Sequence, residues 1–259
     1  MDLGIAGRKA IVCASSRGLG RGCALALAQA RCDVVVNGRD AKKLEETAAE
    51  LRRLTSAKIT AVAADVATAE GQHKLIAACP DPDILVNNNA GPPFRDFREL
   101  TREQIIEGVI ANMVVAIELI QKVIDSMVTR KFGRIVNITS GSVKMPLVGL
   151  DLSSGARAGL TAFLAGVARS VAASNVTINF LLPGPFDTDR LQGNIAATAK
   201  KKAISLEQAR NERIAAVPAK RLGTPEEFGA ACAFLCSTQA GFITGQNLLL
   251  DGGVYPGTL

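Results

Sequence analysis

Short apolar runs alternate along this chain with longer segments in which apolar residues recur every three or four positions. The short runs predict strands at residues 10–13, 34–36, 59–63, 83–86, 133–139, 176–182 and 248–250. The periodic segments predict helices, the clearest of them at residues 40–54, 102–130 and 152–174. Thr224 followed by Pro225 is typical of a further helix start.

Strands that are apolar throughout and alternate with helices predict a parallel sheet with helices on both faces. We therefore expect an α/β protein, a doubly wound Rossmann fold with a parallel sheet of about seven strands. The 259 residues are compatible with one such core, so residues 1–259 are expected to form a single domain. These sheets bind ligands beyond the carboxyl ends of their strands, and the residues that follow each strand are therefore candidates for a site.

Composition excludes several classes of partner. The net charge of +6 comes from scattered cations, and 4% aromatic residues offer little to stack on bases, so no nucleic-acid partner is expected. No signal peptide and no apolar run long enough to cross a bilayer is present, so no membrane partner is expected. The cysteines lack the spacing of a disulfide scaffold or a metal site, which indicates reduced thiols in a cytoplasmic protein. They are Cys13, Cys23, Cys32, Cys79, Cys232 and Cys236.

The stretch 10–22, AIVCASSRGLGRG, reads as a strand, a tight turn and the start of a helix. Backbone N–H groups and the positive end of a helix dipole converge at such a turn, which suits a phosphate group. Glycines there let a pyrophosphate approach the backbone. The alternative to a phosphate-binding turn is a turn whose only role is to pack the following helix against the sheet. A cofactor bound here would contact Cys13, Ser15, Ser16, Arg17, Gly18, Leu19 and Gly20.

The residue after the second strand distinguishes NAD from NADP, because an Asp or Glu there binds the adenosine ribose of NAD. Here Asn37 holds that position, Arg39 follows it, and Arg17 lies in the glycine-rich turn. Two cations without a carboxylate favour the additional phosphate of NADP, whereas Asp40 resembles a helix N-cap. We therefore expect NADPH as the cofactor rather than NAD. The alternative for Arg39 is an ordinary surface cation.

Small or polar residues follow the other strands as well. Three asparagines stand in the stretch 85–93, LVNNNAGPP, where short amides brace the backbone or contact a ligand. Ser140 follows the fifth strand. The further candidates for cofactor contacts at strand ends are Asp65, Val66, Asn88, Pro183, Gly184 and Thr188.

Taken together, these motifs resemble the classical short-chain dehydrogenase/reductase family, in particular its members similar to 3-oxoacyl-acyl-carrier-protein reductases. The resemblance covers essentially the whole chain: CASSRGLG stands where the family has TGxxxGxG, and RLGTPEE and ITGQNLLLDGG match its closing signature. It places the family's asparagine pair on Asn87 and Asn88. It also implies an adenine contact, a catalytic amide, a catalytic hydroxyl and a nicotinamide contact, in chain order, at Asp65, Asn112, Ser140 and Thr188.

The chain departs from the family at its catalytic Tyr-x-x-x-Lys pair, where Ser153 replaces the tyrosine and Arg157 the lysine. The family's tyrosine donates a proton to the carbonyl oxygen, and a serine hydroxyl is a far weaker acid. Arg157 can hydrogen-bond a ribose and supply positive charge, but it cannot relay a proton. General acid catalysis contributes roughly 10²–10⁴-fold, so a simple ketone would be reduced slowly without a replacement donor.

Three groups are candidates to replace the family's tyrosine as the proton donor. Lys144, on the loop after Ser140, titrates near neutrality if it is desolvated, and is otherwise a solvated cation. Asp151 is close in sequence. The third is a water molecule ordered by Asn112 and Ser153. Asp187 and Asp189 flank Thr188 and are expected to cap the following helix instead.

The predicted function is an NADP(H)-dependent oxidoreductase that acts on a small carbonyl or alcohol substrate with an atypical proton donor. The alternative, motivated by the loss of both Tyr and Lys, is a catalytically silent nucleotide-binding or scaffold protein. Residues 186–217 resemble the family's substrate lid, and the family implies a homo-oligomer, a tetramer or a dimer. The candidates for an apolar substrate pocket are Phe94, Phe97, Met145, Leu147 and Phe186.

Overall fold

Seven parallel strands form one sheet in the order β3-β2-β1-β4-β5-β6-β7, which confirms the predicted doubly wound fold. The computed structural model describes residues 2–92 and 94–257, so that Pro93 of the asparagine stretch and both ends of the predicted domain lie outside the described residues. The strands are β1 Lys9–Val12, β2 Asp33–Gly38, β3 Ile59–Ala63, β4 Ile84–Asn87, β5 Gly133–Ile138, β6 Val176–Pro183 and β7 Asn247–Leu250.

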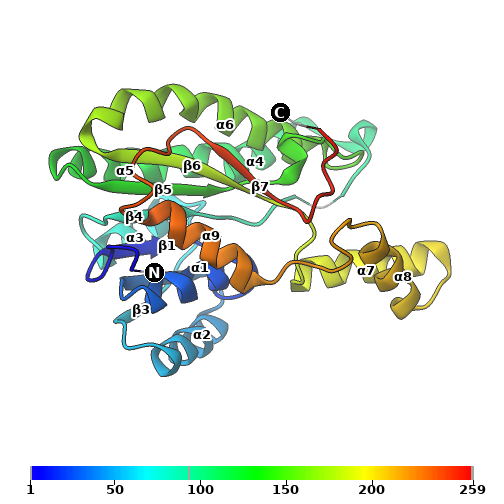
Figure 1. Ribbon diagram of the computed structural model, residues 1–259. Helices are drawn as coiled ribbons and strands as arrows, with labels where there is room; N and C mark the ends of the chain where they lie inside the picture. The colour runs from blue at the N-terminus through cyan, green and yellow to red at the C-terminus, as the bar shows by residue number, and fades with distance from the viewer. Residues whose placement is uncertain (1, 93, 258–259) are drawn as a thin grey trace.

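Helices cover both faces of the sheet (Figure 1). One face packs on α1, α2 and α9 through side chains such as Leu44 and Phe228, and the other packs on α3, α5 and α6 through side chains such as Leu119 and Leu160. Because both faces are buried, the strands are apolar without alternation. The helices are α1 Gly18–Gln29, α2 Ala41–Leu54, α3 Ala69–Ala78, α4 Arg102–Val109, α5 Val115–Thr129, α6 Asp151–Val171, α7 Asp189–Lys202, α8 Leu206–Ala215 and α9 Pro225–Cys236.

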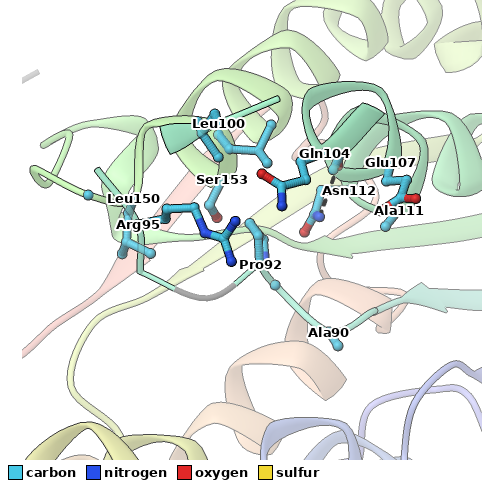
Figure 2. Close-up of a pocket in the computed structure, with 14 residues that line it drawn as sticks. Ala90, Pro92, Arg95, Leu100, Gln104, Glu107, Ala111, Asn112, Leu150 and Ser153 are labelled. Carbon is cyan, nitrogen blue, oxygen red and sulfur yellow. Dashed lines mark hydrogen bonds between the residues drawn. The ribbon is translucent and has the colours of Figure 1, made fainter. Parts of the chain in front are cut away.

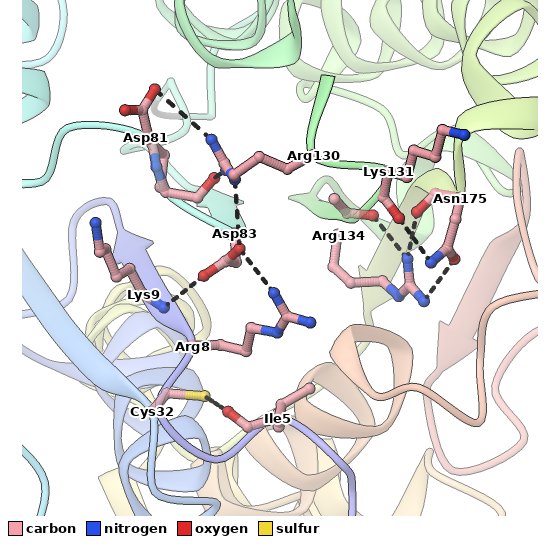
Figure 3. A network of polar contacts seen from close by, with 12 residues as sticks. Ile5, Arg8, Lys9, Cys32, Asp81, Asp83, Arg130, Lys131, Arg134 and Asn175 are labelled. Carbon is pink, nitrogen blue, oxygen red and sulfur yellow. Dashed lines mark hydrogen bonds and ion pairs between the residues drawn. The ribbon is translucent and has the colours of Figure 1, made fainter. Parts of the chain in front are cut away.

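Polar groups near the amino ends of the strands are densely paired (Figure 3). The Asp83 carboxylate accepts hydrogen bonds from Arg8 Nη1 at 3.2 Å and from the Lys9 backbone N–H at 3.0 Å, and it lies 3.8 Å from Arg130 Nε. The buried Arg134 guanidinium donates to the backbone carbonyls of Gly133, Asn175 and Ser237. The charged groups near the amino ends of the strands are therefore hydrogen-bonded, as buried charges must be.

Residues 186–217 contain a hairpin of two helices, α7 and α8, which projects away from the sheet (Figure 1). The hairpin has a small apolar cluster of its own, formed by Ile195, Ala199 and Ala209. Phe186 at its base does not line a substrate pocket as expected. It is buried against Phe228 of α9, with the two ring centroids 5.2 Å apart in an edge-to-face contact.

Helices α1 and α9, about 200 residues apart in sequence, are in backbone contact with each other. A Cβ on Gly22 of α1 would collide with the carbonyl oxygen of Pro225, and a Cβ on Gly229 of α9 would collide with that of Gly22. The predicted helix start is confirmed at Thr224, which caps α9 in a reciprocal capping box with Glu227. Both glycines are thus required by the close approach of the two helices.

We expect Gly22→Ala to lower the free energy of unfolding by about 1–3 kcal/mol, because the added methyl group forces α1 and α9 apart. Urea unfolding followed by circular dichroism measures this change. Gly166→Ala is a matched control in α6, where a Cβ meets nothing within 4 Å. The control is expected to stabilise the protein by about 0.5–1 kcal/mol through helix propensity. Equal effects of the two substitutions would contradict the proposed close contact.

Candidate active site

The carboxyl ends of β1 to β6 meet at one edge of the sheet, because all these strands are parallel. The structure therefore brings together site residues that lie far apart in sequence. Following β1 to β6 in turn are the glycine-rich turn, Arg39, Asp65, Asn88, Ser140 and Thr188.

The turn after β1 has the geometry of a phosphate cradle. Helix α1 begins at Gly18, no side chain caps its first N–H groups, and its first turn contains no acidic residue. A Cβ on Gly20 would collide with the Ala14 carbonyl, so this turn requires glycine. Uncapped N–H groups at the positive end of a helix dipole fit the pyrophosphate of a dinucleotide.

Three of the predicted contacts in this turn have side chains directed into the protein. The Cys13 thiol is fully buried, and burial raises its pKa to about 12. Ser15 Oγ donates to the Val12 carbonyl at 2.7 Å and accepts from the Asn37 N–H at 2.9 Å. Leu19 packs on the core. Cys13 and Ser15 can therefore contact a cofactor only through their backbone, whereas the side chain of Leu19 is partly accessible.

The interpretation of Asn37 as the ribose-reading residue is wrong, because its side chain is buried and fully engaged. Its Oδ1 accepts from the Ala14 N–H at 3.2 Å, and its Nδ2 donates to the carbonyls of Val62 and Ala64 at 3.1 and 3.0 Å. Asn37 therefore ties the glycine-rich turn to β3. The side chain of Arg39, in contrast, is exposed.

Arg39 and Arg17 both take part in weak surface ion pairs. Arg39 Nη1 lies 3.9 Å from Asp65 Oδ2, and Arg17 Nη1 lies 3.6 Å from Asp189 Oδ2. The two arginine side chains are 74% and 71% exposed. Ion pairs of this kind contribute little to stability, so both cations can turn toward a phosphate at small cost.

The other candidates for cofactor contacts hold the loops at the carboxyl ends of the strands in place. Asn88 Nδ2 donates to the Ala14 carbonyl at 3.1 Å, and Val66 is buried. The Gly184 N–H, directly after Pro183 at the end of β6, donates to the Leu250 carbonyl at 2.8 Å. Thr188 caps α7 by accepting from the Leu191 N–H at 3.4 Å. These bonds fix the strand ends around the cleft.

Asn112 lies in a π-helical segment, Ile110–Val114, that joins α4 to α5. The sequence predicted one continuous helix over 102–130, and the structure differs from this prediction by the wider π-helical turn within it. Asn112 Nδ2 donates to the Gly108 carbonyl at 3.0 Å, and Asn89 Nδ2 donates to the Ala111 carbonyl at 3.1 Å. The two amides satisfy carbonyls in the distorted turn. Asn112 Oδ1 is buried and has no partner among the described residues.

Arg157 occupies the lysine position and is held at the end of β5. Its Nη1 donates to the carbonyls of Ile138 and Thr139, both at 2.8 Å, and its Nε has no partner in the described part of the chain. Burial, together with the charge of Arg190, lowers its pKa to about 10, so it remains charged at neutral pH. Ser140 follows directly, and its Oγ accepts from the Ser142 N–H at 3.1 Å.

A pocket of about 330 Å³ opens beside these residues (Figure 2). Asn112 and Ser153 share its wall, as the sequence predicts. Three polar side chains that the sequence analysis did not identify also line it. They are Arg95 on the loop after β4, and Gln104 and Glu107 on α4.

The other predicted residues of the substrate region lie elsewhere. Lys144 Nζ stands over the Tyr255 ring, 5.8 Å from its centroid, and Lys144 is not among the pocket residues. The aromatic side chains of Phe94 and Phe97 are 52% and 60% exposed and do not line the pocket. Neither do Met145 and Leu147.

A ladder of asparagines behind the pocket also escaped the sequence analysis. Asn87 Nδ2 donates to Asn137 Oδ1 at 3.0 Å, Asn137 contacts the Asn179 carbonyl, and Asn179 Nδ2 donates to the Ile243 carbonyl at 2.7 Å. The signal for this ladder was an asparagine within each of two otherwise apolar strands.

This combination of fold and site defines the short-chain dehydrogenase/reductase family, to which the chain belongs. The family profile described as Enoyl-(Acyl carrier protein) reductase matches residues 13–255.

Its relatives include several reductases. The chain is 30% identical over 251 residues to the NADPH-dependent reductase BacG of Bacillus subtilis, covering 95% of this chain and 97% of that protein. It is 31% identical over 258 residues to the 3-oxoacyl-[acyl-carrier-protein] reductase FabG of Chlamydia muridarum, covering 95% and 97%. Among solved structures, L-sorbose reductase from Gluconobacter frateurii, complexed with NADPH and L-sorbose, superposes with a TM-score of 0.93 at 26% identity over the whole of both chains.

Two expectations about the whole chain can also be compared with the structure. All six cysteines are free and buried. Over residues 2–92 and 94–257, no helix combines the length and apolar character needed to cross a membrane.

Proposed function

We propose that the protein is an NADPH-dependent reductase of a small carbonyl compound, in which a water molecule replaces the family's tyrosine as proton donor. The observation that carries this proposal is the pocket at the carboxyl edge. There Asn112 and Ser153 share one wall, and the Oδ1 of Asn112 is buried within that wall without a partner among the described residues. The phosphate cradle after β1 lies at the same edge of the sheet.

Reduction adds a hydride to the carbonyl carbon and a proton to its oxygen. A bound NADPH supplies the hydride. Ser140 and Asn112 position and polarise the carbonyl oxygen, and Asn112 holds the water that donates the proton. The hydroxide left behind takes up a proton from solvent through the mouth of the pocket.

Two observations favour water over Lys144. A second cavity of about 20 Å³, lined by Asn88, Asn112, Asn137 and Arg157, adjoins Asn112. A polar cavity of this size has room for about one water molecule. The unpartnered Asn112 Oδ1 and Arg157 Nε are polar groups that such a water would satisfy. Lys144, in contrast, stands against Tyr255, outside the pocket.

Arg157 takes the lysine's place as the fixed cation of the site. It is proposed to hydrogen-bond the cofactor ribose while it holds the carbonyls at the end of β5. Its lowered pKa of about 10 leaves it protonated during turnover. An arginine in this position supplies charge and orientation but no proton.

Arg17 and Arg39 are proposed to bind the additional phosphate of NADP and so to make the protein prefer NADP over NAD. BacG is named as NADPH-dependent, and the L-sorbose reductase structure contains NADPH. In this chain β2 itself ends without a carboxylate, the exposed Asp40 caps α2 by accepting from the Lys43 N–H, and Arg39 is the exposed cation there. Asp65 then contacts the adenine and Thr188 the nicotinamide, as in the family.

We expect Arg39→Gln to raise the Kd for NADPH about tenfold or more and to leave the Kd for NADH unchanged, because a charged hydrogen bond to the extra phosphate is lost. Titration of the purified protein, followed by NADPH fluorescence or calorimetry, measures both constants. Arg53→Gln, an exposed arginine later on α2, is the matched control and should change neither. An equal loss for both dinucleotides would contradict the assignment.

Restoring the family's pair tests the proposed proton donor. Ser153→Tyr combined with Arg157→Lys is expected to raise carbonyl turnover about 10²-fold, because a tyrosine acid then replaces water. The matched control, Ser153→Phe with Arg157→Lys, has the same ring without the hydroxyl and should give no gain. NADPH consumption at 340 nm measures both. Equal rates of the two variants would contradict the water-donor mechanism.

We further infer a cytoplasmic homo-oligomer in which residues 1–259 form one domain and 186–217 act as the lid. The free, buried cysteines support the inference of a cytoplasmic location. The exposed apolar side chains of Ile106 and Ile110 near α4, and of Phe163 on α6, support an interface between copies. A protein that binds NADPH but reduces no carbonyl compound would instead be a silent nucleotide-binding scaffold.

A further inference from the structure

Three arginines surround the pocket without a carboxylate partner among the described residues: Arg95, Arg157 and Arg190. This differs from the rest of the same edge, where Arg17, Arg39 and Arg210 each lie within 4 Å of a carboxylate. These three cations are therefore free of ion pairs, and Glu107 is the carboxylate among the residues that line the pocket.

Arg95 is the arginine that enters the pocket itself. Figure 2 shows its guanidinium directed into the cavity between Pro92 and Ser153. Its backbone N–H donates to the Gly149 carbonyl at 2.9 Å, which fixes where the side chain starts. Glu107 lies on the other side of the same pocket, so the two ends of the cavity differ in charge.

Arg190 approaches from the first turn of α7. Its Nη2 donates to the Pro92 carbonyl at 3.0 Å, and it lies so close to Gly91 that a Cβ there would be 2.5 Å from Nη1. Gly91 and Pro92 both line the pocket.

Arg157 adds a third positive charge, next to the small cavity on the other side of Asn112. It is 7% exposed, and its Nε has no partner among the described residues. The charge of Arg190 is one of the causes that lower the pKa of Arg157. An anion in the pocket would relieve this repulsion.

We propose that the substrate is a small carbonyl compound that bears a carboxylate, which Arg95 binds directly while Arg190 and Arg157 supply positive potential. A guanidinium fork matches a carboxylate in geometry and charge. The volume of about 330 Å³ is at the lower end for small-molecule sites, which selects a short oxo acid over a long chain. This inference rests on the proposed carbonyl reduction and specifies its substrate.

The test uses matched pairs of acid and neutral ester: acetoacetate with methyl acetoacetate, and 2-oxobutanoate with methyl 2-oxobutanoate. We expect the wild-type protein to reduce the acids with at least about tenfold higher kcat/KM than the esters. Arg95→Gln should raise the KM for the acids about 10- to 100-fold and leave the esters and the Kd for NADPH unchanged, because one charged hydrogen-bond pair is lost.

Arg98→Gln is the matched control, since Arg98 lies on the same loop, pairs with Asp96 and does not line the pocket. It should change none of these constants. Equal kcat/KM for acids and esters, or an Arg95→Gln effect of equal size on both, would overturn the proposal.

Arg190→Gln separates a substrate carboxylate from a cofactor phosphate. A higher KM for the acids at an unchanged Kd for NADPH supports the proposal. A higher Kd for NADPH at an unchanged KM overturns the part assigned to Arg190.

If NADPH binds but no compound is reduced, the proposed function fails, and calorimetric titration with butanoate and methyl butanoate still tests this inference. Binding of butanoate alone that Arg95→Gln abolishes supports it. Absence of butanoate binding overturns it.

Discussion

The geometry of the active site depends on the two hydrogen bonds from Arg157 to the last carbonyls of β5. They join α6 to the strand end from which Ser140 follows, and Ser153 lies one helical turn before Arg157 on the same helix. Both bonds come from Nη1, and the planar guanidinium fixes Nη2 and Nε relative to it, so the arginine adds rigidly placed donors beside the nitrogen that holds the strand end. The hydroxyl of Ser153, the amide of Asn112 and the end of β5 are thereby held in one arrangement.

The two edges of the sheet use charge in opposite ways. At the amino edge, Asp83 and Arg134 are surrounded by hydrogen-bond partners, as a buried charge requires. At the carboxyl edge, buried polar atoms of Asn87, Asn112 and Arg157 have no partner among the described residues. Unsatisfied buried groups lower stability and are retained where a ligand or water satisfies them. The difference concerns the charged groups, because Thr177 Oγ1 and Asn247 Oδ1, near the amino ends of β6 and β7, are also buried without a partner among the described residues.

The fold could be predicted from the sequence because seven apolar runs and their helix signals agree with one another, from the strand at Ala10 to the cap at Thr224. The positions of Asn112 and Ser153 in one pocket also followed from the motif. Asn37 was misread because its distance from the strand end does not reveal which way an amide points. Arg95 and Arg190 could not be identified, because a loop and a crossing helix set their directions, and neither has a periodic pattern.

The backbone contact between α1 and α9 affects how the chain is made. The face of α1 that carries Cys23 stays uncovered until α9, which carries Cys232 and Cys236, has been synthesised. In the folded protein these thiols are buried, and neighbouring thiols and burial hold the pKa values of Cys232 and Cys236 well above the usual range, which makes them inert. Oxidative damage at this cluster is therefore a hazard of the nascent chain, and the finished protein is protected from it.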